Sequence, residues 1–203
     1  MQTDDGRLYV ISGASRSGKS VWTYRKVKAA KRVAVWDPED QWAKLPGFKK
    51  ITSKADLFHA CKHPGAAKLA YVAGGDLREE FNFFSGCAMH WGMFYGPCAV
   101  VAEELADVST PAKAPGDWGK LVRRGLKRGI DIYAISQRWA EADKTAFGNA
   151  SEIICFRASS DDDIAYIARK TRIPADKLDK LRSLEFVAYD TDTKVCTPGK
   201  IRF

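Results

Sequence analysis

Apolar and polar positions alternate along this chain with two different periods. Six short runs, rich in β-branched and other apolar residues, have the length and composition of strands: 8–12, 32–36, 69–72, 98–102, 131–136 and 152–157. Stretches between them carry apolar residues at helical spacing: 19–30, 54–61, 77–93, 117–129 and 161–170. Strands that alternate with helices are typical of a mostly parallel central sheet with helices on both faces. The pattern therefore predicts an α/β fold.

Two segments depart from this alternation. Residues 184–189 follow the two-residue period of a strand, and the polar stretch 190–193 separates them from a second short apolar run. This arrangement predicts a C-terminal β-hairpin. Residues 108–116 hold two prolines and a glycine, which predicts an exposed loop. The length of 203 residues suits one domain with a sizeable core, so we expect a single domain over residues 1–203.

The compositional features of membrane and secreted proteins are missing from the sequence. No apolar run approaches the ~20 residues that a membrane-spanning helix needs, and the N-terminal residues lack the basic and apolar regions of a signal peptide. The five cysteines are odd in number and form no C-x-x-C pair, which indicates reduced thiols rather than a disulfide framework. We expect a protein that stays inside the cell.

The chain is basic, with a formal net charge of +8, and its positive charge is unevenly distributed. Five cations lie within nine residues and have no acid between them: Lys120, Arg123, Arg124, Lys127 and Arg128. The apolar residues of the same predicted helix share one side, which leaves these cations free to face solvent or a partner. A basic cluster of this kind favours a polyanionic partner, and the alternative is a solvated helix face.

A glycine-rich loop directly follows the first predicted strand and precedes the first predicted helix. It fits the pattern G-x-x-x-x-G-K-[ST] at every fixed position, with the residues Gly13, Ala14, Ser15, Arg16, Ser17, Gly18, Lys19 and Ser20. The two glycines let backbone N–H groups wrap a phosphate beside a helix N-terminus. Lys19 would reach the β- and γ-phosphates, and Ser20 would ligate Mg²⁺. The sequence therefore predicts that ATP and Mg²⁺ are the cofactors.

Two carboxylates follow the predicted strand 98–102, and hydrolysis of a phosphoanhydride requires groups of this kind. We assign Glu103 to the magnesium shell through water, and Glu104 to the general base. Gln137 follows the strand 131–136 and could orient the attacking water or contact the γ-phosphate. The alternatives are acids that solvate a strand end and an ordinary surface glutamine.

The order of these motifs resembles the FtsK-HerA superfamily of DNA-translocating ATPases. The phosphate loop, the Glu-Glu strand, the basic helix and the strand ending in Ser136-Gln137-Arg138 occur in that order, and Arg157-Ala158-Ser159-Ser160 resembles a further motif of the superfamily. The resemblance implies a RecA-like P-loop NTPase fold of the ASCE class. One departure is that the superfamily's strand usually ends in Asp-Glu, whereas Glu103 stands here in place of the aspartate.

Within the superfamily, the chain is most similar to the genome-packaging ATPases of tailless, membrane-containing icosahedral viruses. That resemblance implies ATP hydrolysis coupled to translocation of double-stranded DNA. It also implies a homo-oligomeric ring, expected to be a hexamer, with ATP at the subunit interfaces. Capsid or portal-vertex proteins are candidate further partners. The expected location is the cytoplasm of the host cell or a capsid vertex of the virion.

Ring ATPases of this kind use an arginine from the neighbouring subunit to neutralise charge on the transferred phosphoryl group. Arg124 and Arg128 are the candidates that the resemblance suggests, with Arg157 as the alternative. Contact with the DNA backbone is the competing role of the same helix, with Lys120, Arg123 and Lys127 as its candidates, and Lys113 in the preceding loop is a further candidate.

Two other functions fit a phosphate loop. A small P-loop nucleotide kinase would act without DNA and would need an arginine-bearing lid over its acceptor, for which segment 169–182 is the candidate. A nucleotide-dependent switch would bind a partner, and Glu104 would be dispensable in it.

Overall fold

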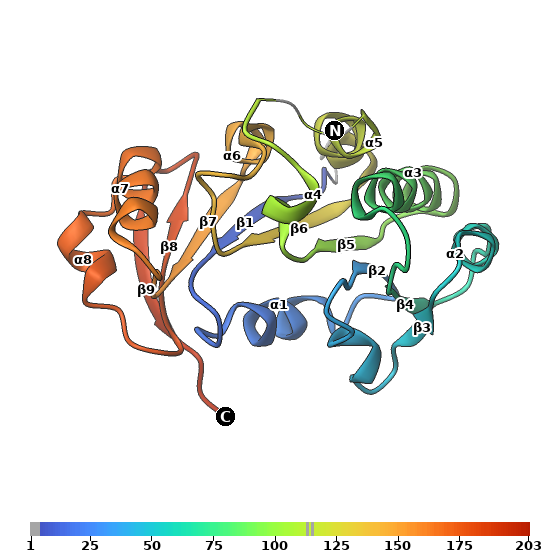
Figure 1. The fold of residues 1–203 in the computed structure, drawn as a ribbon, viewed down its shortest axis with the longest axis horizontal. Coiled ribbons are helices and arrows are strands. Elements are labelled where there is room, and N and C mark those ends of the chain that lie inside the picture. Colours follow the sequence, from blue (N-terminus) through green and yellow to red (C-terminus); the bar gives the residue numbers. More distant parts are fainter. Residues whose placement is uncertain (1–4, 113, 115) are drawn as a thin grey trace.

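The computed structural model describes residues 5–112, 114 and 116–203. Within this part of the chain, nine strands form one sheet in the order β3-β4-β2-β5-β6-β1-β7-β8-β9 (Figure 1). Their bounds are β1 Leu8–Ser12, β2 Arg32–Trp36, β3 Lys49–Ile51, β4 Ala67–Tyr71, β5 Ala99–Ala102, β6 Asp131–Ser136, β7 Glu152–Phe156, β8 Glu185–Asp190 and β9 Cys196–Lys200. Neighbouring strands from β3 to β7 are parallel, and β8 and β9 add an antiparallel hairpin. The mostly parallel sheet and the C-terminal hairpin are confirmed.

Helices cover both faces of the sheet, as predicted. Their bounds are α1 Lys19–Val27, η1 Trp42–Lys44, α2 Lys54–Ala60, α3 Leu77–Tyr95, α4 Leu105–Val108, α5 Gly116–Lys120, η2 Leu121–Gly125, η3 Leu126–Arg128, α6 Lys144–Asn149, α7 Asp161–Lys170 and α8 Ala175–Asp179. The short α1 and η1 lie on one face, and α3, α5 and α6 lie on the other (Figure 1). No helix among the described residues is both long and apolar enough to cross a bilayer.

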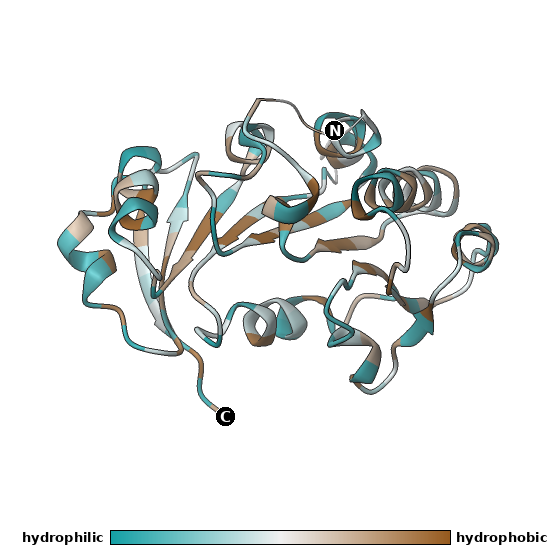
Figure 2. Ribbon diagram, in the orientation of Figure 1, coloured by the Kyte–Doolittle hydropathy of each residue, from teal (hydrophilic) through white to brown (hydrophobic). Residues whose placement is uncertain are grey.

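Alternation of side chains along the buried strands divides the core into two layers. In β2, Val33 and Val35 pack in the layer under α1, whereas Ala34 and Trp36 pack in the layer under α3. The parallel strands are buried on both faces and consist of nearly continuous apolar runs. Figure 2 shows these hydrophobic residues concentrated in the central strands, with hydrophilic residues on the outer helices.

The predicted bounds are met closely by several strands and helices. β1, β2, β6 and α7 have the expected residues, and α1 ends at Val27 rather than near Ala30. Five elements of three to six residues, namely β3, η1, α4, α6 and α8, were not predicted. Each is too short to display a period in the sequence. The predicted loop 108–116 is only partly exposed, because Val108 and Ser109 are buried.

The predicted basic helix is regular only at its start. α5 gives way to the π-helical segment η2 and then to the 3₁₀ turn η3, which ends at Gly129 in the left-handed conformation (φ 70°). Asp117, the first residue of the predicted helix 117–129, does not cap it. It lies in the first turn, its backbone N–H donates to Asn82 Oδ1 (2.8 Å), and its carboxylate pairs with Lys120 (2.7 Å). Asn82 thus supplies from α3 an acceptor for the helix start.

Candidate active site

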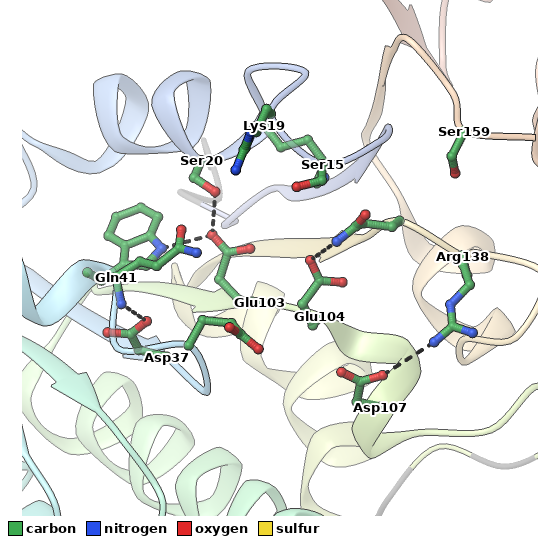
Figure 3. A pocket seen from close by; sticks show the side chains of 14 residues that line it. Ser15, Lys19, Ser20, Asp37, Gln41, Glu103, Glu104, Asp107, Arg138 and Ser159 are labelled. Carbon is green, nitrogen blue, oxygen red and sulfur yellow. Dashed lines mark hydrogen bonds and ion pairs between the residues drawn. The ribbon is translucent and has the colours of Figure 1, made fainter.

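A polar cavity of about 470 Å³ opens at the edge of the sheet where the parallel strands end. Segments that follow β1, β2, β5, β6 and β7 line it, and Figure 3 shows their side chains pointing into one common space. The lining residues are Ser15, Arg16, Lys19, Ser20, Asp37, Glu39, Gln41, Trp42, Glu103, Glu104, Asp107, Gln137, Arg138 and Ser159. In an open α/β sheet, the carboxyl edge is where ligands bind.

The phosphate loop, residues 13–20, has a backbone that requires glycine at two positions. Gly13 (φ 151°) and Gly18 (φ 117°) both adopt conformations that side chains disfavour. A Cβ atom on Gly13 would lie 2.6 Å from Phe156 Cβ, and one on Gly18 would lie 2.9 Å from Ile201 Cδ1. Glycine is therefore required at both positions by the backbone conformation and by the lack of space for a side chain.

Segments from the C-terminal half of the sequence hold this loop from behind. The Ala14 N–H donates to the carbonyl of Arg157 (2.7 Å), directly after β7. The Leu184 N–H donates to the carbonyl of Ser17 (2.9 Å), and the Ser183 hydroxyl donates to the carbonyl of Arg16 (3.2 Å). The segment after β7 and the two residues that lead into the C-terminal hairpin thus form the back wall of the loop.

Lys19 is buried inside the phosphate loop. Its Nζ donates to the carbonyls of Gly13 (2.8 Å) and Ala14 (2.9 Å). Burial lowers the pKa of the Lys19 ammonium, and the nearby Glu104 and Glu103 carboxylates oppose that shift. The side chain is held at the cavity wall, where an anionic ligand would provide a stronger acceptor than the two carbonyls.

Glu103 follows β5, and one of its carboxylate oxygens accepts two hydrogen bonds. Oε1 accepts from Ser20 Oγ (2.9 Å) and from Trp42 Nε1 (2.8 Å). Burial raises the pKa of the Glu103 carboxyl, while these two hydrogen bonds and Lys19 act in the opposite direction. The structure thus brings the predicted pair Ser20 and Glu103 together, as an oxygen-rich group of the kind that Mg²⁺ prefers.

Glu104 has an unusual backbone and a specific partner. Its φ of 45° and ψ of 54° place it in the left-handed region, which costs a non-glycine residue roughly 1 kcal/mol or more. Gln137, at the end of the neighbouring strand β6, donates from Nε2 to Glu104 Oε1 (2.8 Å), as the dashed line from Glu104 in Figure 3 marks. Because of this turn after β5, Glu103 and Glu104 both line the cavity.

Several lining residues were not predicted to belong to the site. Asp37 and Trp42 come from the segment after β2, and Arg138 and Ser159 come from segments after β6 and β7. Arg138 is paired with Asp107 (3.7 Å) and Glu141 (3.1 Å). Two of these residues could have been found from their positions in the sequence, because Arg138 directly follows Gln137 and Asp37 directly follows a buried strand. Trp42 carried no such signal, because it lies in a three-residue turn.

The candidates for an arginine finger, and the described candidates for DNA contact, lie outside this cavity. Arg124 and Arg128 are exposed on η2 and η3, and η3 leads into the amino end of β6, at the opposite edge of the sheet. Arg157 has an exposed side chain, although its carbonyl holds the phosphate loop. Lys120, Arg123 and Lys127 are exposed on the same helical segment. Lys113 lies outside the described residues.

Comparison of sequences identifies a viral relative of the chain, although no protein-family model matches it. Protein P9 of Pseudoalteromonas phage PM2 is 31% identical over 175 residues, which cover 84% of this chain and 74% of protein P9.

Comparison of structures gives full-length matches at low identity. The genome packaging NTPase B204 from Sulfolobus turreted icosahedral virus 2, in complex with AMPPCP, matches with a TM-score of 0.80 and 16% identity over 98% of both chains. The bacterial conjugative coupling protein TrwBdeltaN70 matches with a TM-score of 0.70 and 8% identity, over 99% of this chain and 86% of the other. These matches confirm the predicted P-loop NTPase fold.

Proposed function

Because this chain belongs to the family of protein P9 of Pseudoalteromonas phage PM2, we propose that it is a P-loop ATPase of the FtsK-HerA superfamily and that it hydrolyses ATP to translocate double-stranded DNA as a viral genome-packaging motor. One observation carries the proposal: a complete phosphate loop faces two consecutive glutamates and a glutamine at the same edge of the sheet. A protein that only binds nucleotide needs the loop but has no need of the rest of this arrangement. We propose that residues 1–203 act as one ATPase domain.

The residues of the cavity fit ATP and Mg²⁺. The buried Ser17 hydroxyl has no hydrogen-bond partner within the described part of the chain, and the first N–H groups of α1 point out of its N-terminus. The loop residues 13–20 would hold the phosphates, with Lys19 at the β- and γ-phosphates. Ser20 would ligate Mg²⁺, and Glu103 would hold a water of its shell. The bound ion would neutralise charge on the phosphate oxygens.

The chain's own residues then divide the work of hydrolysis. Glu104 would accept a proton from the attacking water as general base. The hydrogen bond from Gln137 fixes the carboxylate of Glu104 in the cavity, and the same amide could contact the water or the γ-phosphate. Hydrolysis would therefore alter the contacts of a residue at the end of β6, one strand away from the phosphate loop.

The position of the arginines supports an assembly of several copies. Arg124 and Arg128 are exposed and do not line the cavity of their own chain, so any contact with nucleotide would come from a neighbouring subunit. We propose a ring, with six subunits as the expected number and Arg157 as the alternative donor. Lys113, Lys120, Arg123 and Lys127 would contact the DNA backbone. A capsid or portal-vertex protein would receive the ring, in the host cytoplasm or at a vertex of the virion.

The kinase alternative receives less support. Its candidate lid, segment 169–182, contributes no residue to the lining of the cavity, and α8 packs against α7 instead. The switch alternative does not account for the contact between Gln137 and Glu104.

The proposal is tested by the ATPase rate with and without duplex DNA at increasing salt, together with the mass in solution in ATP and Mg²⁺. We expect an oligomer whose ATPase rate rises with DNA, and we expect the DNA concentration for half-maximal stimulation to rise steeply with salt because phosphate contacts release counterions. The Lys19→Ala variant is the control for contaminating ATPases. A monomer whose ATPase rate does not change with DNA would contradict the proposal.

A further inference from the structure

Trp42 contacts the proposed magnesium site although it lies in a different segment from every residue predicted for that site. It is 1% exposed, and its indole Nε1 donates to Glu103 Oε1 (2.8 Å). Ser20 Oγ donates to the same oxygen (2.9 Å). Among the residues that the structure describes, no donor is bonded to Glu103 Oε2. The two hydrogen bonds therefore fix one oxygen of the carboxylate and leave the other available to a ligand.

The backbone around Trp42 is fixed by a single buried carboxylate. Asp37, 1% exposed, accepts from the N–H of Gln41 with Oδ1 (2.8 Å) and from the N–H of Ala43 with Oδ2 (2.9 Å). These two residues flank Trp42 on either side. Asp37 thus holds the 3₁₀ turn η1 in place at the end of β2, next to β5 in the sheet.

The indole ring is also fixed by its packing. It meets Phe48 edge to face at 5.5 Å between ring centres and Tyr24 at 6.3 Å, in the core layer under α1. A buried aromatic ring with neighbours on two sides has little rotational freedom, so its N–H is a donor in a fixed direction. Neither Asp37 nor the ring neighbours contact Glu103 by a hydrogen bond, and their effect on it passes through Trp42.

We infer that Trp42 is a positioning residue that orients Glu103 for magnesium. The inference rests on the proposed ATPase function. A glutamate has one more rotatable bond than an aspartate, and a donor on each side of Oε1 removes that freedom. Oε2 then faces the cavity, where it would accept from a water of the metal shell.

The direct test is Trp42→Phe, which keeps a buried aromatic ring and removes the N–H. Nucleotide affinity is measured in EDTA and then at increasing Mg²⁺, alongside the ATPase rate at the same Mg²⁺ concentrations. We expect unchanged affinity in EDTA, a Mg²⁺ requirement about 10- to 100-fold higher, and a lower rate at limiting Mg²⁺. A Mg²⁺ requirement equal to that of the wild type, in binding and in turnover, would overturn the inference.

Trp91→Phe is the matched control. Trp91 is fully buried in α3, and its Nε1 donates to the carbonyl of His63 (2.9 Å), away from the cavity. The substitution removes the same N–H and leaves a carbonyl unpaired, and we expect no change in Mg²⁺ requirement. If Trp91→Phe raises the requirement as much as Trp42→Phe does, the effect is general destabilisation and the inference fails.

A double-variant cycle separates positioning from packing. Glu103→Asp shortens the side chain and withdraws its oxygens from Trp42. In that background Trp42→Phe should change the Mg²⁺ requirement by less than about twofold, because the two residues act through one contact. Full additivity would overturn the inference. This cycle measures metal-dependent nucleotide binding. It therefore still tests the inference if DNA does not change the ATPase rate and the proposed motor function fails.

Discussion

Gln137 donates a hydrogen bond from its side-chain amide to Oε1 of Glu104 over 2.8 Å, and so joins the carboxyl ends of the neighbouring strands β6 and β5. An amide is a neutral donor, so it fixes the carboxylate without supplying a proton or a positive charge. A general base held in this way keeps its second oxygen free for water. The contact also ties the proposed base to a strand other than its own.

Glu104→Gln should stop hydrolysis while leaving nucleotide binding largely intact. A positioned general base contributes about 10²- to 10⁴-fold to the rate, and the amide cannot accept the proton. Single-turnover hydrolysis and equilibrium binding of ATP measure the two effects separately. Asp107→Asn is the control, because it neutralises another acid of the same cavity. Turnover retained in Glu104→Gln would reassign the base.

Gln137→Ala should lower turnover less than Glu104→Gln does, by roughly tenfold, because the base remains but is no longer fixed. The measurement is the rate at saturating ATP, with nucleotide affinity as the check that the loop is intact. In the double variant with Glu104→Gln, the loss should not exceed that of Glu104→Gln alone. Additive losses would mean that Gln137 acts on the phosphate or the water independently of Glu104.

Lys19→Ala should abolish turnover and weaken ATP binding by at least about tenfold, since it removes a buried cation that would contact phosphate. Lys26→Ala is the matched control. Lys26 lies on the same helix, α1, and its ammonium lies over the Trp22 ring (5.1 Å) outside the cavity. Isothermal titration with ATP compares the variants. Equal affinities would remove Lys19 from the nucleotide site.

An arginine that acts on a neighbouring subunit should be revealed by mixing variants. Arg124→Ala or Arg128→Ala is expected to be inactive alone, as is Glu104→Gln. At equal mixing, about a quarter of the interfaces in a ring would pair an intact base with an intact arginine, and activity should partly return. A mixture of the arginine variant with the double variant of that arginine and Glu104→Gln is the control, because no interface in it holds an intact arginine. Failure to recover activity with either arginine would favour a DNA or surface role for this helix.

Glu103→Gln should stabilise the metal-free protein while impairing turnover. Burial raises the pKa of Glu103 above its ordinary 4.5, so the folded state favours the protonated form. The stability of the wild type therefore falls as pH rises from about 4.5 through the raised pKa, and glutamine removes that loss. The amide oxygen still accepts from Ser20 and Trp42.

Thermal unfolding in EDTA at several pH values measures this difference. At pH 7, a gain on the order of 1 kcal/mol would raise the Tm by roughly 2–4 °C. The gain should shrink as the pH approaches 4.5, where the wild-type carboxyl is itself protonated. A difference that stays constant with pH would contradict the role of charge burial.

The sequence predicted the parts of the fold in which apolar residues form a clear run or a regular spacing, and the parts that carry a fixed motif. The strands β1, β2 and β6 were predicted to the residue, because each is a buried apolar run bounded by polar residues. Glu103, Glu104 and Gln137 were placed at one edge because they follow strands of a parallel sheet. That β5 and β6 are neighbours depends on contacts distant in sequence, and this adjacency brings Glu104 to Gln137.

Features set by single contacts could not be predicted. Glu104 has a left-handed backbone, and glutamate rarely adopts that conformation. The hydrogen bond between Trp42 and Glu103 spans 61 positions and begins in a three-residue turn. The helix that starts at Gly116 takes an acceptor from Asn82, so the nearby Asp117 is not needed as a cap.

The back wall of the phosphate loop bears on the order in which the site can form during synthesis. Ser183 contacts the carbonyl of Arg16 across 167 positions of the chain, so the loop leaves the ribosome well before the residues that support it. A nascent chain that ends before Ser183 would carry the full nucleotide-binding motif on a loop without that support. We therefore expect tight nucleotide binding to mark a subunit in which the segment that leads into the C-terminal hairpin has already docked against the loop.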